Sequence, residues 1–293
     1  MIWVEGRIVG DEELHISALD RTFEHGLGLF ETLRTWGGHP TLLPRHLDRL
    51  MRSGRMLDLE IDSSSLPDAP AVASLLAADG RAGDAVLRIT ASGGDPSTRR
   101  PVLWMRSAEL PMMAGTATCR LELIGGGPLD EHKSLNYLER REAFQRAQSG
   151  GWDETLRCTA DGEIREGSRT SIFAVRGGRV WTPPLRGAAS TPGGWGKSPE
   201  VRPGRQPGPS PIVPGVMRRL VIEQAAMMGV SVVEDILQVN EVPEYEEMLL
   251  TNSVRGIQPV SRVGEVVLDA PGPLTTCLWS ALRTRLESGE IDR

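Results

Sequence analysis

The chain has 293 residues, of which 39% are hydrophobic and 25% are charged, so it has enough apolar material for one large or two modest globular domains. Its net charge of -6 is not gathered into a basic block or an acidic tail, which argues against a surface for nucleic acid or for a membrane. No run approaches the roughly 20 apolar residues that span a bilayer.

The start of the chain carries Glu5 and Gly6 where a secretory signal would have a basic and then an apolar region, so we expect a cytoplasmic protein. The cysteines Cys119, Cys158 and Cys277 are odd in number and far apart. This spacing predicts reduced thiols, and neither a disulfide framework nor a metal site such as zinc.

The first half of the chain mixes predicted strands with predicted helices. Alternating apolar residues predict strands over 3–9, 26–36 and 85–90. Apolar residues near helical spacing predict a helix over 44–57, which Pro44 can open, and a second helix over 71–76.

The second half follows a junction near residues 114–117. It is predicted to contain helices over 136–148 and after Pro214, and strands over 119–124, 154–159, 171–175, 179–182 and 230–233. Because this order lacks regular βαβ alternation, it favours the α+β class over a doubly wound parallel sheet.

Residues 186–211 differ in composition from the rest of the chain. They include six glycines and six prolines among 26 residues and almost no large apolar side chains. Such a segment cannot bury much surface, so we interpret it as a loop inserted into the second half, with either no role of its own or that of a lid.

Three separated segments contain residues suited to catalysis. Lys133 lies between a glycine-rich segment and the start of a predicted helix. Glu166 follows a predicted turn and precedes an apolar strand. Two small-residue turns, at 214–218 and 251–254, supply amides and hydroxyls that suit a phosphate, one of them at the start of a helix. Each signal alone is weak, since an isolated lysine is most often a surface residue.

In combination and order these motifs resemble the class IV aminotransferases, which are fold type IV pyridoxal-phosphate enzymes and include branched-chain and D-amino-acid aminotransferases and aminodeoxychorismate lyase. The resemblance covers nearly the whole chain outside 186–211, including Phe30-Glu31-Thr32 and the motif from His46 to Leu50. It implies an α+β protein with a small N-terminal α/β domain over 1–114 and a larger, barrel-like mixed α/β domain over 118–293 that binds the cofactor.

The resemblance also implies roles for individual residues toward pyridoxal 5′-phosphate. Lys133 would form a Schiff base with the cofactor and act as the catalytic base, and Glu166 would keep the pyridine nitrogen protonated. Arg49 would bind the phosphate in two-point fashion. The remaining phosphate contacts would come from four residues, namely the amides of Val216 and Met217 together with Asn252 and Ser253.

Two positions depart from the family pattern. Ser171 stands where many members have asparagine, and Met217 stands where the aminotransferases usually have a threonine that contacts phosphate. Some lyases of the family have methionine at the second position. The hydroxyl contact is lost there, whereas the backbone amide remains.

The substrate would lie between the strand that carries Phe30 and the loop from Ser92 to Arg100. Arg99 and Arg100 are candidates for binding its carboxylate, although both are also typical of a solvated surface. No aromatic-rich pocket for a branched side chain is evident. We therefore expect a small amino acid and a 2-oxo acid as substrates, and a homodimer, which is common in the family.

Several functions remain open at this point. Transamination leads, and elimination of pyruvate from aminodeoxychorismate to give 4-aminobenzoate is the alternative, favoured by Met217 and the stretch from Thr251 to Val254. A homologue that binds cofactor without catalysis is a third possibility, against which Lys133 and Glu166 argue. A nicotinamide enzyme is excluded because the glycine clusters lack the spaced fingerprint between a strand and a helix.

Overall fold

A computed structural model describes residues 1–81, 83–112, 115–123, 126–127, 129–185, 211–289 and 291. The chain forms two compact units: unit 1 is Met1–Met112, His132–Tyr137 and Thr284–Arg293, and unit 2 is Met113–Glu131 and Leu138–Arg283. The segment 186–211 lies, except for Pro211, outside the described residues. None of the helices in the described part of the chain is long and apolar enough to cross a membrane.

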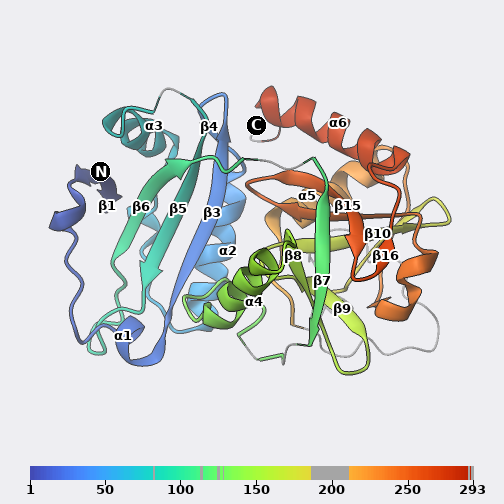
Figure 1. Ribbon diagram of the computed structural model, residues 1–293. Helices are drawn as coiled ribbons and strands as arrows, with labels where there is room; N and C mark the ends of the chain where they lie inside the picture. Colours follow the sequence, from blue (N-terminus) through green and yellow to red (C-terminus); the bar gives the residue numbers. More distant parts are fainter. Residues whose placement is uncertain are drawn as a thin grey trace. The chain divides into compact units, whose positions relative to one another are not determined.

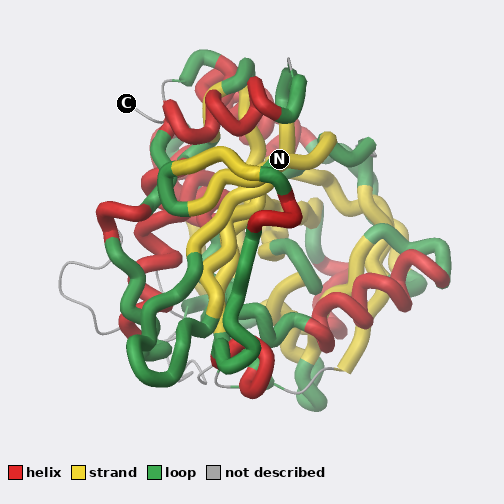
Figure 2. The backbone as a smooth tube through the Cα atoms, turned by 90° about the vertical axis from the view of Figure 1, so that its left-hand side faces the viewer, coloured by secondary structure: helices red, strands yellow, loops and turns green. Residues whose placement is uncertain are grey.

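Unit 1 is built on a six-stranded sheet with the strand order β2-β1-β6-β5-β3-β4. Its elements in chain order are β1 (Ile2–Val4), β2 (Arg7–Val9), η1 (Asp11–Glu13), α1 (Arg21–His25), β3 (Gly28–Trp36), β4 (His39–Pro40), α2 (Leu43–Met56), η2 (Ser63–Ser65), α3 (Ala69–Ala78), β5 (Ala85–Ser92) and β6 (Leu103–Glu109). All its strand pairs are antiparallel, and Figure 2 shows the strands in yellow running side by side.

Helices α2 and α3 pack against this sheet (Figure 1). The core between them includes Leu33, Leu87, Val72 and Leu75, which are fully buried. Each such side chain stabilises the fold by about 2 kcal/mol through removal of apolar surface from water. Because β3 and β5 alternate, their other side chains lie on the opposite face of the sheet, away from α2.

The expectation of one strand over 3–9 is wrong. Residues 2–9 form a hairpin in which Ile2 is opposite Val9 and Val4 is opposite Arg7. Glu5 and Gly6, with φ of 44° and 91°, form a two-residue turn of the kind that reverses antiparallel strands. The apolar alternation correctly predicts extended backbone on both sides of the turn. It does not reveal the turn itself, because glutamate is uncommon at positive φ.

Unit 2 is built on a ten-stranded mixed sheet with the order β12-β11-β10-β14-β15-β7-β8-β9-β13, and β16 pairs with β15 outside this path. Its elements are β7 (Ala117–Leu123), α4 (Leu138–Ser149), β8 (Glu154–Cys158), β9 (Glu163–Gly167), β10 (Ser171–Arg176), β11 (Arg179–Thr182), α5 (Val216–Met227), β12 (Val232–Glu234), β13 (Leu237–Gln238), η3 (Val239–Glu244), β14 (Glu247–Asn252), β15 (Gly256–Val263) and β16 (Val266–Val267). Helix α6 (Pro273–Glu287) ends in the last segment of unit 1.

Strand β15 connects the two kinds of pairing in unit 2, being antiparallel to β14 and parallel to β7. Strand β7 in turn pairs in parallel with β8, and β8 pairs in antiparallel with β9. The mixture of parallel and antiparallel strands without regular βαβ units confirms the α+β class.

Candidate active site

Lys133 is held in unit 1 by a short backbone pairing with β3. Its carbonyl accepts a hydrogen bond from Phe30 N at 2.9 Å, and Leu135 N donates to Gly28 O at 2.9 Å. Gly28 makes this approach possible, because its φ is 143° and a Cβ there would lie 2.6 Å from the Leu135 side chain. The lysine is therefore fixed in register with the start of β3.

The aromatic ring of Phe30 organises the surroundings of Lys133. Lys133 Nζ lies 4.5 Å from the ring centroid, and Arg88 Cζ lies 3.8 Å from the same centroid. The Tyr137 ring stands edge-on to Phe30, with centroids 5.2 Å apart. Phe30 is buried while Lys133 is half-buried, so the amine is neither in bulk water nor enclosed in the core.

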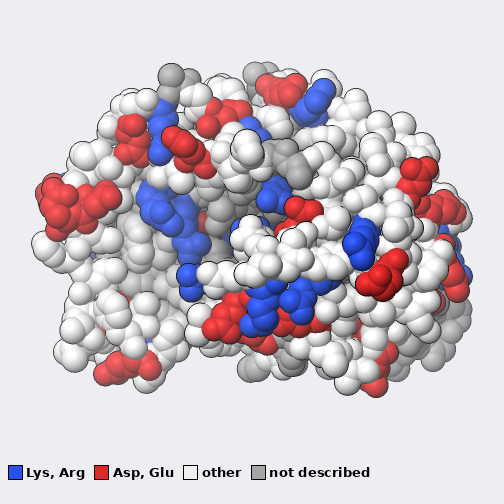
Figure 3. Space-filling model, viewed as in Figure 1, with Lys and Arg blue, Asp and Glu red and all other residues white. Residues whose placement is uncertain are grey.

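Arg88 lies mid-strand in β5, directly across from Arg106 of β6. Residues opposite each other in an antiparallel pair share a face, and like charges there are destabilising. Burial lowers the pKa of Arg88 and the charge of Arg106 lowers it further, partly opposed by Tyr137. In the view of Figure 3, Lys and Arg side chains gather over this part of the sheet. Among the described residues, the titratable groups that act on Arg88 are Arg106 and Tyr137 and include no carboxylate, so the site is electrostatically suited to an anion.

Arg49 belongs to a buried cluster with Glu31 and His46. Its Nε donates to Glu31 Oε1 at 2.8 Å, and its Nη2 donates to Glu31 Oε2, the atom that also accepts from His46 Nδ1 at 2.7 Å. Burial raises the pKa of Glu31, but the charge and hydrogen bonds of Arg49 and His46 outweigh it and lower that pKa to about 2. Glu31 is therefore ionised and holds the guanidinium in place.

The candidate residues Arg99 and Arg100 are exposed on the loop after β5. Arg99 Nη1 pairs with Asp58 at 2.9 Å, and Arg100 Nη2 lies 3.5 Å from Asp62. The base of this loop is anchored by Asp20, whose Oδ2 accepts from Ser92 Oγ at 2.6 Å. Exposed pairs of this kind are worth little, so both arginines can exchange their partner for another anion.

Glu166, on β9 of unit 2, is buried among two arginines. Its Oε1 accepts from Arg140 Nη2 at 2.7 Å and from Arg157 Nη1 at 3.1 Å. Its Oε2 accepts from Val213 N at 3.2 Å, which ties the carboxylate to the segment leading into α5. Asp130 Oδ2, 3.1 Å from Arg157 Nη2, balances the second guanidinium.

Val216 and Met217 are the first two residues of α5, whose N-cap is Gly215. The first amides of a helix have no intrahelical acceptor, so they are available to an anion. A Cβ on Gly215 would lie 2.6 Å from Ser171 Oγ, so the approach to the helix needs glycine. Helix α5 packs against β14. At the end of β14, Asn252 Oδ1 accepts hydrogen bonds from Val254 N and Arg255 N. The next residue, Ser253, is buried.

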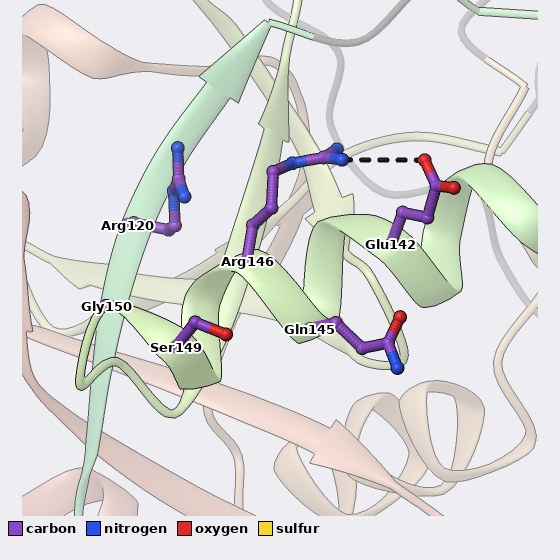
Figure 4. Close-up of a pocket in the computed structure, with 6 residues that line it drawn as sticks. All are labelled: Arg120, Glu142, Gln145, Arg146, Ser149 and Gly150. Atoms are coloured by element: carbon purple, nitrogen blue, oxygen red, sulfur yellow. Dashed lines mark ion pairs between the residues drawn. The ribbon is translucent and has the colours of Figure 1, made fainter.

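A surface depression with a volume of about 410 Å³ lies elsewhere in unit 2, beside α4 and β7. Figure 4 shows the residues that line it, which are Arg120, Glu142, Gln145, Arg146, Ser149 and Gly150. Arg146 there pairs with Glu142 at 3.6 Å and with Glu122. None of the candidate residues lines it, so we assign it no part in the site.

Comparison of the chain with known proteins identifies its family. The family model described as amino-transferase class IV matches residues 28–263. The chain belongs to the class IV aminotransferase family. It is 26% identical over 280 residues to a Methanocaldococcus jannaschii protein designated a branched-chain-amino-acid aminotransferase, covering 91% of this chain and 89% of the relative.

Two further similar proteins, a lyase and an aminotransferase, show that this chain resembles members of the family with different activities. An aminodeoxychorismate lyase of Bacillus subtilis is 25% identical, over 91% of this chain and 87% of the lyase. The crystal structure of a Thermoproteus uzoniensis branched-chain aminotransferase with norvaline matches with a TM-score of 0.82 at 23% identity, over 98% of this chain and 94% of that one. The fold type IV architecture is thereby confirmed.

The class IV aminotransferases use pyridoxal 5′-phosphate, and the described residues fit that group. The start of α5, with Gly215 in a place that a Cβ would fill, can receive the phosphate. Glu166 Oε2 accepts one hydrogen bond within the protein, and a carboxylate oxygen can accept a second from a protonated ring nitrogen. Lys133 carries a primary amine, the group that can attach to the aldehyde of this cofactor.

Sequence reasoning missed four residues around these groups: Arg88, Arg140, Arg157 and the acid Glu31 as the partner of Arg49. Arg88 and Arg157 carried a usable signal, since each is a charged residue inside a short apolar strand. Arg140 lies on a helix with charged residues on all sides, so its burial had no sequence signature. Glu31 was noted within a motif but was not given a contact.

Proposed function

We propose that this pyridoxal-phosphate enzyme is an aminotransferase that moves an amino group between a small amino acid and a 2-oxo acid, with Lys133 as its catalytic base. The observation that carries the proposal is the arrangement around Phe30, where the Lys133 amine and the Arg88 guanidinium lie against one aromatic ring. An amino acid needs both a base near its α-carbon and a cation for its carboxylate.

Each residue has a distinct task in this proposal. Lys133 Nζ would accept the α-proton of the amino acid and hold it for return, while the amino group would pass to the cofactor and water would supply the oxygen of the 2-oxo acid. Arg88 binds a carboxylate of the substrate and Phe30 limits access of water. Pyridoxal phosphate, when bound, supplies the sink for the electrons left on the α-carbon. Glu166 would hold a proton on the ring nitrogen, and Arg49 with the start of α5 and Asn252 and Ser253 would hold the phosphate.

The test follows from the lysine content, because the chain has only two lysines, Lys133 and Lys197. Borohydride reduction of the cofactor-loaded chain, followed by peptide mass spectrometry, should mark Lys133 alone. Adding an amino acid without a 2-oxo acid should convert the cofactor absorbance band to that of pyridoxamine phosphate. Lys133→Ala should abolish both results, whereas Lys197→Arg, the matched control, should leave both unchanged. A mark on Lys197 in place of Lys133 would refute the proposal.

The second candidate is an aminodeoxychorismate lyase that releases pyruvate. It is supported by Met217, a buried side chain at the start of α5 where the aminotransferases usually have threonine, and by the 25% identity with the Bacillus subtilis lyase. Pyruvate release from aminodeoxychorismate, together with no pyridoxamine band across a panel of D- and L-amino acids, would favour this candidate over transamination.

We also propose that the enzyme is a homodimer in the cytoplasm, with Arg99 and Arg100 near the substrate entrance. The unpaired state of all three cysteines supports a reducing compartment. Light scattering of the purified chain tests the dimer. Arg99→Ala with Arg100→Ala should raise KM without changing kcat if the loop binds substrate.

A further inference from the structure

His46 has one ring nitrogen with a partner and one without. Its side chain is fully buried, and Nδ1 lies 2.7 Å from Glu31 Oε2. Because Glu31 is ionised and can only accept, Nδ1 carries the proton and Nε2 is a bare acceptor. Nε2 is buried and has no hydrogen-bond partner among the described residues. A buried acceptor of this kind normally has a donor, so its state needs an explanation.

The charges that act on His46 come from three elements. Glu31 of β3 and Arg49 of α2 bracket it, and Lys133 of the segment 132–137 adds a positive field. Burial lowers the pKa of His46; Glu31 raises it, while Arg49 and Lys133 lower it again, and the net result is below the ordinary value. The imidazole is therefore neutral when no anion is bound beside Arg49.

Resting on the proposed function, we infer that His46 takes up a proton at Nε2 from the solvent when a phosphate group binds beside Arg49. The reason is charge balance: Glu31 already cancels the charge of Arg49, because two of its nitrogens donate to that carboxylate. A phosphate dianion added beside this neutral pair leaves net negative charge in a buried place. A proton on His46 reduces it, and both Arg49 Nη2 and His46 Nδ1 contact the same oxygen, so the ring lies within range of the anion's field.

The orphaned nitrogen is the site that takes up this proton. Once protonated, Nε2 changes from an acceptor to a donor, while Nδ1 keeps its bond to Glu31. Glu31 then has two cationic partners, and its carboxylate becomes the shared counter-ion of Arg49 and His46. His46 is thus a positioning residue whose charge is coupled to phosphate binding, and it touches neither the substrate nor the reacting carbon.

The protonation state can be read directly by nitrogen NMR. The chain has only five histidines, so full-length protein labelled with ¹⁵N-histidine gives a spectrum that single variants can assign. In the cofactor-loaded protein both ring nitrogens of His46 should show the protonated chemical shift near neutral pH. After removal of the cofactor, Nε2 should move to the unprotonated shift. His46→Asn identifies the signals, because asparagine can keep the amide donor to Glu31 but cannot accept a proton.

Calorimetry supplies an independent measurement. Pyridoxal 5′-phosphate is titrated into cofactor-free full-length chain in two buffers of different ionisation enthalpy, and the heat difference counts protons taken up. Pyridoxal, which lacks the phosphate, is the comparison ligand. The phosphate-specific uptake should approach one proton near neutral pH, and affinity should fall by up to about tenfold per pH unit as pH rises through the window between the two pKa values.

Variants separate this coupling from a structural role. His46→Asn should abolish the phosphate-specific proton uptake and flatten the pH dependence, while His39→Asn, at an exposed position of β4, should leave both as in the wild type. If His46 stays neutral in the loaded protein, or if His46→Asn takes up the same number of protons, the inference is overturned. That outcome differs from failure of the proposed function, in which the chain would not bind the cofactor through Lys133 at all.

Discussion

The buried carboxylate of Glu31 predicts how the free energy of unfolding changes at acid pH. Its side chain is fully buried, and its pKa is lowered from the ordinary value of 4.5 to about 2. At about 1.4 kcal/mol per pH unit, this difference corresponds to about 3 kcal/mol of stability at neutral pH. Because the pKa is lower in the folded than in the unfolded chain, that stabilisation is present above pH 4.5 and is lost as pH falls toward 2. About 2 kcal/mol of it should be lost between pH 7 and pH 3.

The perturbation is Glu31→Gln, which keeps the shape of the side chain and removes its titration. Urea unfolding followed by tryptophan fluorescence at pH 7, 5, 4 and 3 gives the unfolding free energy of both proteins. The wild type should lose about 2 kcal/mol more than the variant between pH 7 and pH 3. Glu60→Gln, an exposed glutamate of the same unit, should follow the wild type. Parallel pH curves for wild type and Glu31→Gln would refute the reasoning.

Three further predictions concern other parts of the molecule. Arg88→Gln should raise KM about 10- to 100-fold in steady-state assays, since a charged hydrogen bond to the substrate carboxylate is lost, and an unchanged KM would exclude Arg88 from binding. Glu166→Gln should lower the unfolding free energy by about 3 kcal/mol in denaturant titrations, because two buried guanidiniums lose their counter-charge; a loss below 1 kcal/mol would contradict this. Burial raises the pKa of Cys158 to about 11 and that of Cys119 as well, so a thiol reagent at pH 8 should modify only the exposed Cys277 in the native protein and all three cysteines after denaturation.

Regular patterns in the chain predicted many of its elements. Alternating apolar residues identified β5, β10 and β11 within one or two residues, and helical spacing with Pro44 identified α2. These assignments succeed because one face of each element is buried against a core, which imposes a period on the sequence. The short helix α1 was missed because five residues are too few to establish a period, although Asp20 caps it by accepting a hydrogen bond from Thr22 N.

The motifs likewise predicted the family and the cofactor. Lys133, Glu166 and the turn before α5 are each weak signals, but their order along the chain is specific, and a linear order can be read without a fold. Their individual roles toward the cofactor stay predictions. The structure adds the local reasons for their positions, such as the backbone pairing that fixes Lys133 against β3.

Contacts between distant segments had no signal in the sequence. The pairing of Arg88 with Arg106 depends on the register of β5 and β6, and the bond from Val213 to Glu166 joins residues 47 positions apart. The orphaned nitrogen of His46 depends on which side of α2 faces β3. A sequence thus determines periodicity, caps and motif order, which are local properties, whereas register and burial, which set the charge state and partners of each side chain, are decided only when the chain packs.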